Sequence, residues 1–207
     1  MVKIATTSTK NFFKNAVKSV IISEDRKETL SKIAKYITQE YKKSGVVNLN
    51  FICTHNSRRS QLGQVWAFFA AEYFNLKINS FSGGTEVTAF FRNTVKTLQK
   101  VGFTFQVADF SHQNPKYHIS FEGTSKSILG FSKRYDHPEN NNPFVAITTC
   151  NNADANCPFI PEALERFHLP FVDPKAFDET EKQDEAYLKT SKQIAAEIYF
   201  IFQKVSL

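Results

Sequence analysis

The 207-residue sequence has few cysteines, no apolar stretch long enough to cross a membrane and no tract of clustered arginines. Three cysteines are an odd number, which argues against the disulfide framework of a small secreted protein. The first ten residues are rich in Thr and Lys and lack the apolar core of a secretory signal. We therefore expect a cytoplasmic protein with no membrane partner, whose cysteines stay reduced and serve catalysis, redox chemistry or metal binding.

The charge pattern gives no support to nucleic-acid binding. The formal net charge of +6 comes from scattered lysines, and no recognisable nucleic-acid-binding motif accompanies them. Solvated helix faces explain most of this charge, and a basic balance also attracts small anions. A chain of this length suffices for one sizeable α/β core and leaves little for a second domain. We predict no nucleic-acid partner.

Strands alternate with helices after a helical lead-in. Residues 1–45 are expected to form an N-terminal helical extension, in which Ser23 caps a helix that Gly45 ends. The predicted strands cover residues 46–52, 77–82 (broken at Gly83–Gly84) and 144–149, and the predicted helices cover 61–74, 90–101 and 179–202. This alternation predicts a mostly parallel sheet covered on both faces.

The stretch from Phe105 to Pro143 is harder to interpret. Residues 117–121 and 127–131 fit paired strands around a short turn, and the Asn-rich segment 136–143 fits a surface loop. His112 and His118 fall in this stretch and complete no convincing metal site.

The most informative segment is Cys53–Ser60, with the sequence CTHNSRRS, between a predicted buried strand and an amphipathic helix. A loop at a helix N-terminus directs backbone N–H groups and the helix dipole at one spot, which suits a tetrahedral oxyanion. The same field favours a nucleophilic thiolate at Cys53. Arg59 adds a planar fork that can hold two oxygens. The alternative is that Cys53 is merely a small buried hydrophobe at a strand end.

A second group of residues begins at Cys150, where another predicted strand ends, and reaches Cys157 after a short polar segment. Carboxyl ends of parallel strands share one edge of a sheet, so Cys53 and Cys150 are expected to meet. A thiolate can attack a sulfur that is already bonded elsewhere, so three thiols can form a relay. The alternatives are inert thiols or metal binding, but two cysteines seven residues apart make a poor zinc pattern. We predict no metal site.

A third element is Asp173, followed by Pro174. A carboxylic acid on a proline-stiffened loop can protonate a leaving oxygen if it folds over Cys53. In isolation, an Asp-Pro pair more often marks a turn or a helix start.

In this order, the elements resemble the thioredoxin-coupled arsenate reductases of the low-molecular-weight protein tyrosine phosphatase superfamily. The resemblance runs from about Asn48 to the C-terminus. It rests on four segments of the sequence. The first is the loop at 53–60 together with the following Gln61 and Trp66-Ala67, and the others are FSGGTE at 81–86, the segment 150–158 and Asp173-Pro174. The cysteine pair with Ala153-Asp154 is specific to the reductases, since the phosphatases share the loop and the Asp-Pro but generally lack that pair.

The resemblance implies a three-layer α/β fold around a central, mostly parallel four-stranded sheet. The chain then divides into the N-terminal helical extension (1–45) and a catalytic domain (46–207), with an inserted loop or hairpin at about 106–143. No tightly bound cofactor is implied, although a monovalent cation near Asn56 is compatible with the family. The expected partners are arsenate, phosphate or sulfate in the anion loop, and thioredoxin as electron donor.

The resemblance also implies a role for each matched residue. Cys53 attacks arsenate, Ser60 stabilises its thiolate and Asp173 assists departure of an oxygen as water. Cys150 attacks Cys53, and Cys157 then attacks Cys150 to present a disulfide to thioredoxin. The implied oxyanion-binding residues are Thr54, His55, Asn56, Ser57, Arg58 and Arg59, and the implied supports of the loop are Asn56 and Ser82.

Two loop residues depart from the family pattern. His55 stands where the family usually has glycine, and a positive φ there would strain the backbone. Arg58 stands where many members have cysteine, and is expected to add positive charge beside the anion.

Two other functions stay open at this point. A phosphatase acting through a phosphocysteine intermediate would use Cys53, Arg59 and Asp173, although Lys175-Ala176 replace the aromatic residues that usually follow the Asp-Pro there. A non-catalytic oxyanion-binding or redox-sensing module would keep the loop without turnover.

Overall fold

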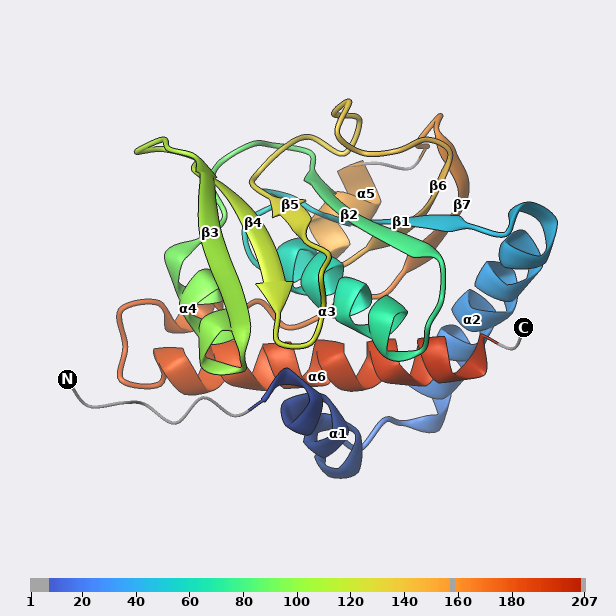
Figure 1. Cartoon of the computed structure of the whole chain (residues 1–207), viewed down its shortest axis with the longest axis horizontal. Helices are drawn as coiled ribbons and strands as arrows, with labels where there is room; N and C mark the ends of the chain where they lie inside the picture. Colours follow the sequence, from blue (N-terminus) through green and yellow to red (C-terminus); the bar gives the residue numbers. More distant parts are fainter. Residues whose placement is uncertain (1–7, 157–158, 206–207) are drawn as a thin grey trace.

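The computed structural model describes residues 8–156 and 159–205 of the chain. Its centre is a four-stranded parallel sheet in the order β2-β1-β6-β7 (Figure 1). The strands are β1 (Val47–Cys53), β2 (Ile78–Gly84), β6 (Phe144–Thr148) and β7 (Ala163–His168). All three pairings are parallel, so the carboxyl ends of the four strands meet at one edge. The predicted α/β fold with a parallel four-stranded sheet is confirmed.

Helices and packed segments cover both faces of this sheet. The large core joins Leu49 and Phe51 of β1 to α3 (Arg59–Tyr73) and α6 (Gln183–Lys204). The alternate residue Ile52 belongs to a smaller cluster on the opposite side, with Ala153 of α5 (Asn151–Asn156). Successive strand residues face opposite sides, so one strand supplies both cores.

Helix α2 (Glu24–Ser44) begins and ends where the sequence predicts. Ser23 is the N-cap and its Oγ accepts a hydrogen bond from the Arg26 N–H at 3.4 Å. Gly45 closes the helix in the left-handed conformation at φ 71°, which glycine adopts without a steric penalty.

Helix α1 (Thr9–Ser19) belongs to the same core as the sheet domain. The Phe13 ring is fully buried, stacks on Trp66 at 5.7 Å between ring centroids and meets Phe69 edge-on at 5.0 Å. Figure 1 shows α1 lying against α6, so α1 is not a detached extension. The first two helices therefore pack as part of the fold.

The inserted region forms a second, antiparallel sheet in the order β3-β4-β5, beside α4 (Arg92–Lys100). The predicted pairing around the turn at Gly123 is confirmed, between β4 (Lys116–Phe121) and β5 (Ile128–Gly130). The preceding strand β3 (Phe103–Asp109) was not predicted, and it pairs with β4 along its length.

The predicted break at Gly83–Gly84 is wrong, because β2 runs through both glycines to its end. A side chain at Gly83 would place its Cβ 2.2 Å from the Cα of Tyr135. These glycines thus permit the 133–135 segment to pass against the strand, where the Gly84 N–H donates to the Lys133 carbonyl at 2.8 Å. None of the helices in residues 8–156 and 159–205 is long and apolar enough to span a membrane.

Candidate active site

Cys53 is the last residue of β1, and the loop after it leads directly into α3 at Arg59. Its side chain is buried, and its Sγ lies 3.0 Å from the Ser60 Oγ. The Asn56 Nδ2 donates to the same Ser60 oxygen at 2.8 Å. Because that oxygen already accepts a hydrogen bond from Asn56, the Ser60 proton is free to be donated to sulfur. This chain of contacts directs a hydroxyl group at the Cys53 sulfur.

Asn56 gives the loop its shape. It adopts a positive φ of 45°, and its Oδ1 accepts hydrogen bonds from the Lys133 N–H at 2.9 Å and the Gln61 Nε2 at 3.2 Å. Gln61 also donates to the Asn56 carbonyl at 3.0 Å and to that of Phe131 at 2.9 Å. Asparagine tolerates the left-handed conformation better than most residues. The buried Gln61 brace was missed at the sequence level, although Gln61 directly follows the Arg-Ser pair.

His55 does not carry the positive φ that its replacement of glycine suggested. Its carbonyl accepts hydrogen bonds from the Thr88 Oγ1 at 3.0 Å and the Ser132 Oγ at 2.9 Å. Its imidazole Nε2 lies 3.3 Å from the Glu86 carboxylate, on the exposed side of the loop. The anticipated strain is absent at this position, since the left-handed position of the loop falls on Asn56.

The backbone N–H groups of the loop are available to an anion. Among the residues that the structure describes, none accepts a hydrogen bond from the N–H groups of 55–58. No side chain caps the start of α3 at Arg58 either. Unpaired N–H groups at a helix N-terminus form a cradle for a phosphate-like oxyanion.

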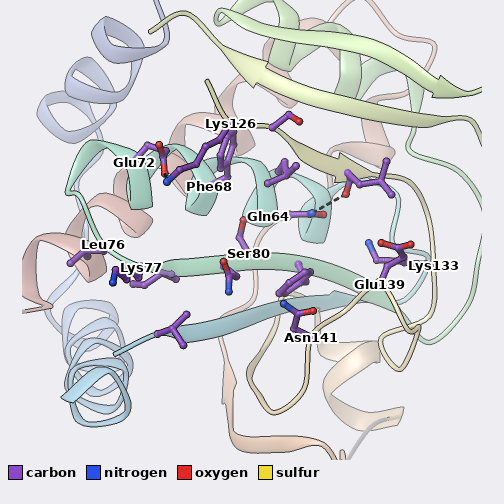
Figure 2. Close-up of a pocket in the computed structure, with 17 residues that line it drawn as sticks. Gln64, Phe68, Glu72, Leu76, Lys77, Ser80, Lys126, Lys133, Glu139 and Asn141 are labelled. Carbon is purple, nitrogen blue, oxygen red and sulfur yellow. Dashed lines mark hydrogen bonds and ion pairs between the residues drawn. The ribbon is translucent and has the colours of Figure 1, made fainter. Parts of the chain in front are cut away.

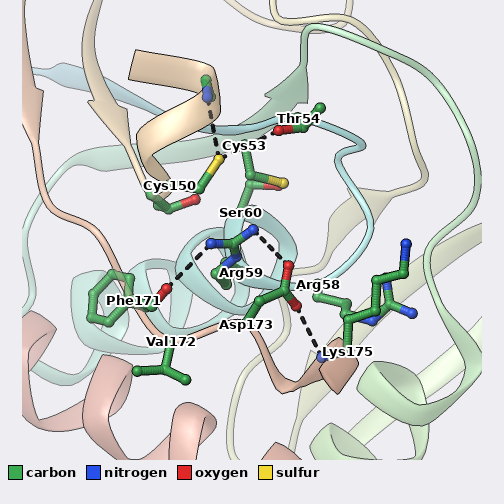
Figure 3. A network of polar contacts seen from close by, with 12 residues as sticks. Cys53, Thr54, Arg58, Arg59, Ser60, Cys150, Phe171, Val172, Asp173 and Lys175 are labelled. Carbon is green, nitrogen blue, oxygen red and sulfur yellow. Dashed lines mark hydrogen bonds and ion pairs between the residues drawn. The ribbon is translucent and has the colours of Figure 1, made fainter. Parts of the chain in front are cut away.

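Arg59 reaches from the first turn of α3 to the loop that carries Asp173. Its Nη2 lies 2.6 Å from the Asp173 Oδ2, and its Nη1 donates to the Phe171 carbonyl at 3.2 Å (Figure 3). The other Asp173 oxygen accepts from the Lys175 N–H at 3.0 Å, at the start of η1 (Pro174–Phe177). The Asp-Pro segment therefore does fold onto the anion loop, and an anion gripped by Arg59 would compete with Asp173 for its guanidinium.

The Arg58 side chain differs from the expectation, because its guanidinium does not serve as a charge beside the anion. Its Nη2 lies 2.6 Å from the Asp178 Oδ2, its Nε donates to the Tyr187 hydroxyl at 2.6 Å, and its guanidinium carbon lies 3.8 Å from the centre of the Phe91 ring. The Tyr187 hydroxyl donates to the second Asp178 oxygen at 2.6 Å. Burial raises the pKa of Tyr187, with Asp178 acting in the same direction, so the phenol keeps its proton.

Cys150 stands just before α5, after the end of β6. Its buried Sγ accepts a hydrogen bond from the Ala153 N–H at 3.4 Å and lies 3.5 Å from the Thr54 Oγ1. Cys53 and Cys150 are free thiols in the same small buried cluster, so the shared edge of the sheet brings them together. The predicted role of Cys157 lies outside the described residues.

The remaining predicted positions have separate surroundings. Ser57 is buried and its carbonyl accepts from the Phe91 N–H at 3.1 Å. The Ser82 Oγ donates to the Gln64 Oε1 at 2.6 Å, so Ser82 contacts α3 and makes no hydrogen bond to the loop itself. The described ranges contain no group of three or more His, Cys, Asp and Glu side chains able to hold a metal ion. A monovalent cation near Asn56 stays a prediction.

A cavity of about 470 Å³ opens at this site, with Arg59, Cys150, Asn151 and Phe171 among its lining residues. The Arg59 guanidinium and the Cys150 thiol line this cavity, which lies next to the loop that begins at Cys53. The arrangement can hold a tetrahedral oxyanion for attack by sulfur, and another thiol lies in the same small buried cluster as Cys53.

Comparison with known proteins gives a consistent result. The chain is 30% identical over 139 residues to an arsenate reductase of Bacillus subtilis strain 168, covering 67% of this chain and 82% of that one. It is 32% identical over 133 residues to arsenate reductase 1 of Staphylococcus epidermidis, covering 64% and 82%. The crystal structure of a YwlE mutant from Bacillus subtilis covers 76% of this chain and 97% of its own, with a TM-score of 0.51 and 12% identity, which shows a shared fold. No protein-family model matches the chain.

Proposed function

Because this chain belongs to the arsenate reductases built on the low-molecular-weight protein tyrosine phosphatase fold, we propose that it reduces arsenate to arsenite by a relay through Cys53, Cys150 and Cys157. The family supports arsenate reduction. The assignment of each residue and of the electron donor is the proposal.

In the first step, the Cys53 thiolate attacks the arsenic of arsenate bound in the loop. A sulfur–arsenic bond forms and an arsenic–oxygen bond breaks, and the oxygen leaves as water after receiving protons, one of them from Asp173. The N–H groups of the loop and the Arg59 fork hold the remaining oxygens. The hydrogen bond of 3.0 Å between Ser60 and Cys53 supports this role for the sulfur.

In the second step, the Cys150 thiolate attacks the Cys53 sulfur. A sulfur–sulfur bond forms, the sulfur–arsenic bond breaks, and its electron pair stays on arsenic, which leaves as arsenite. The two thiols lose two electrons together and arsenic gains two. In the third step, Cys157 attacks the Cys150 sulfur and releases the Cys53 thiolate, and a dithiol such as thioredoxin reduces the resulting Cys150–Cys157 disulfide.

One observation carries this proposal: a second free thiol, Cys150, shares the buried cluster of Cys53. Hydrolysis of a phosphate ester needs only the nucleophile, the fork and the acid. A second thiol in the cavity beside Arg59 is required for reduction and superfluous for hydrolysis. This position favours the reductase over the phosphatase.

The test is arsenate-dependent NADPH consumption in the presence of thioredoxin and thioredoxin reductase. Multiple turnover should be lost in Cys53→Ser, Cys150→Ser and Cys157→Ser, whereas Thr149→Ser, beside Cys150, should retain it. Cys150→Ser should also trap arsenic on Cys53 in a mass spectrum, because the first step needs no second thiol.

The phosphatase alternative predicts a different pattern. Turnover of 4-nitrophenyl phosphate would need Cys53 and survive the loss of Cys150, and arsenate would not be reduced. Full multiple-turnover reduction of arsenate by Cys150→Ser would refute the relay while leaving the family assignment intact.

A further inference from the structure

A larger cavity, of about 610 Å³, lies apart from the Cys53 site, between the edge strands of the two sheets (Figure 2). Strand β2 is an edge strand of the four-stranded sheet, and β5 is an edge strand of the three-stranded sheet. Residues of both strands line the cavity. Gln64, Phe68 and Glu72 of α3 lie between them. None of its lining residues lines the cavity beside Arg59 and Cys150. We name it the edge cavity.

One wall of the edge cavity carries a buried ammonium group. Lys133 is only 2% exposed, and burial lowers its pKa to about 8 despite the opposing influence of Glu139. Its Nζ faces the Phe131 ring, 4.7 Å from the centroid. Within the described part of the chain, no hydrogen bond or ion pair is formed by this Nζ. A buried charge without a close partner carries a large desolvation penalty.

A second buried polar group lines the same cavity. Ser80 of β2 is 5% exposed, and its Oγ finds no hydrogen-bond partner among the described residues. Other polar side chains of the cavity are already engaged: Glu72 pairs with Lys126 at 2.7 Å, and Gln64 donates to the Leu129 carbonyl at 3.2 Å. Buried polar groups in native proteins are nearly always hydrogen-bonded, so a free buried hydroxyl calls for a partner such as a water, an ion or a ligand.

The charge of these groups restricts the ligand class. An ammonium donates hydrogen bonds and accepts none, so it suits an anionic oxygen. One buried positive charge balances one negative charge, so a single carboxylate matches it better than a dianion such as a phosphate ester. Phe68, Leu76 and Ile78 provide apolar surface in the same cavity.

We propose that the edge cavity binds a small organic carboxylate, whose charge pairs with Lys133 and whose apolar body lies against Phe68 and Ile78. The volume falls in the range of small-molecule sites. The site is independent of the proposed function at Cys53. It is nevertheless connected to the anion loop, because the Lys133 N–H donates to the Asn56 Oδ1 at 2.9 Å.

The experiment is an NMR titration of the reduced protein with hexanoate, with hexan-1-ol as the uncharged probe of matched length. Hexanoate should shift the amides of β2, β5 and Lys133 and bind at least about tenfold more tightly than hexan-1-ol, since it alone neutralises the buried ammonium. Lys133→Met should weaken hexanoate binding by at least about tenfold. Lys126→Met is the matched control, because Lys126 lines the same cavity but already pairs with Glu72.

Three results would overturn the proposal. Equal affinities for hexanoate and hexan-1-ol would make the cavity merely apolar. Unchanged hexanoate binding in Lys133→Met would remove the charge pairing. Shifts confined to the loop at 53–60, or tighter binding of inorganic phosphate in the edge cavity, would assign the anion to another site or another class. The comparison of the two probes on the unmodified protein decides the question even if Lys133→Met fails to fold.

Discussion

Arg59 and Asp173 form an ion pair, with 2.6 Å between the Nη2 and the Oδ2. The preceding residue, Arg58, pairs with Asp178 at the same distance. The two carboxylates flank the single turn η1, so two consecutive arginines at the start of α3 hold both ends of the turn that brings Asp173 to the site. The position of the proposed acid therefore depends on both pairs.

Asp173→Asn should separate anion binding from turnover. Removing the carboxylate frees the Arg59 fork, so the inhibition constant of phosphate should fall several-fold. Turnover of arsenate should fall about 100-fold, because the acid that protonates the leaving oxygen is gone. Steady-state kinetics with phosphate as competitor measure both effects. The control is Asp184→Asn, at an exposed carboxylate paired with Lys96 and Lys100, which should change neither the inhibition constant of phosphate nor the turnover of arsenate. Weaker phosphate binding in Asp173→Asn would contradict the competition between Asp173 and the anion for Arg59.

Arg58→Met should destabilise the protein by about 2 kcal/mol, because it leaves the Asp178 carboxylate without its partly buried partner. Urea unfolding measures the change. The turnover number should also fall, since η1 loses one of its two anchors. Lys27→Met is the control: it removes an exposed pair with Glu24 and should cost less than about 0.5 kcal/mol. Equal effects of the two substitutions would show that Arg58 is no anchor.

Asn56→Gly and Asn56→Ala lose the same side-chain hydrogen bonds but differ in backbone freedom. At φ 45°, alanine is disfavoured and glycine is not, so the alanine variant should be less stable by about 1 kcal/mol. This order reverses the one found in a helix interior. Unfolding by urea at pH 7 gives the difference, and an alanine variant as stable as the glycine variant would mean that the loop changes its conformation.

Lys133→Met should stabilise the protein at neutral pH. The pKa of Lys133 is about 8 in the folded state against 10.5 unfolded, so both states are protonated below pH 8 and burial of the charge costs up to about 3 kcal/mol. Between pH 8 and 10.5 the unfolded state binds more protons, and stability rises with pH. The advantage of the methionine variant should therefore shrink over this window.

Urea unfolding of both proteins at pH 7 and pH 10 measures the change with pH. The charged neighbours Glu139 and Lys116 are present in both, as is His137, whose pKa burial lowers below its ordinary value and which titrates outside the window. Their contributions cancel in the comparison. A pH-independent difference would show that Lys133 keeps its ordinary pKa.

Local signals in the sequence were sufficient for much of the fold. The cap at Ser23 and the stop at Gly45 set the ends of α2, because both act through bonds within a few residues. The positions of Cys53 and Cys150 at one edge followed from the parallel order of strands alone. Each of these inferences needs only the pattern of one segment and a general rule of sheets.

The features that the sequence did not predict depend on contacts between distant segments. Arg58 looked like an anion ligand because of its neighbours in the loop, but its partner Asp178 lies 120 residues further along. Nothing in the sequence sets Lys133 apart from the other lysines, and its burial arises where residues of β2, β5 and α3 come together around the edge cavity. Strand β3 has mostly exposed residues over its second half, so it lacks the alternation that marks a half-buried strand.

The stacking of Phe13 on Trp66 has a practical consequence for anyone shortening this protein. Trp66 lies on α3, the helix whose first turn supplies Arg59, and α1 covers it. A chain trimmed to start at β1 would expose that indole ring and its aromatic neighbours to water, and would lose the α2 residues of the same core. The two helices before the sheet are thus part of the hydrophobic core and should be retained in any truncated variant.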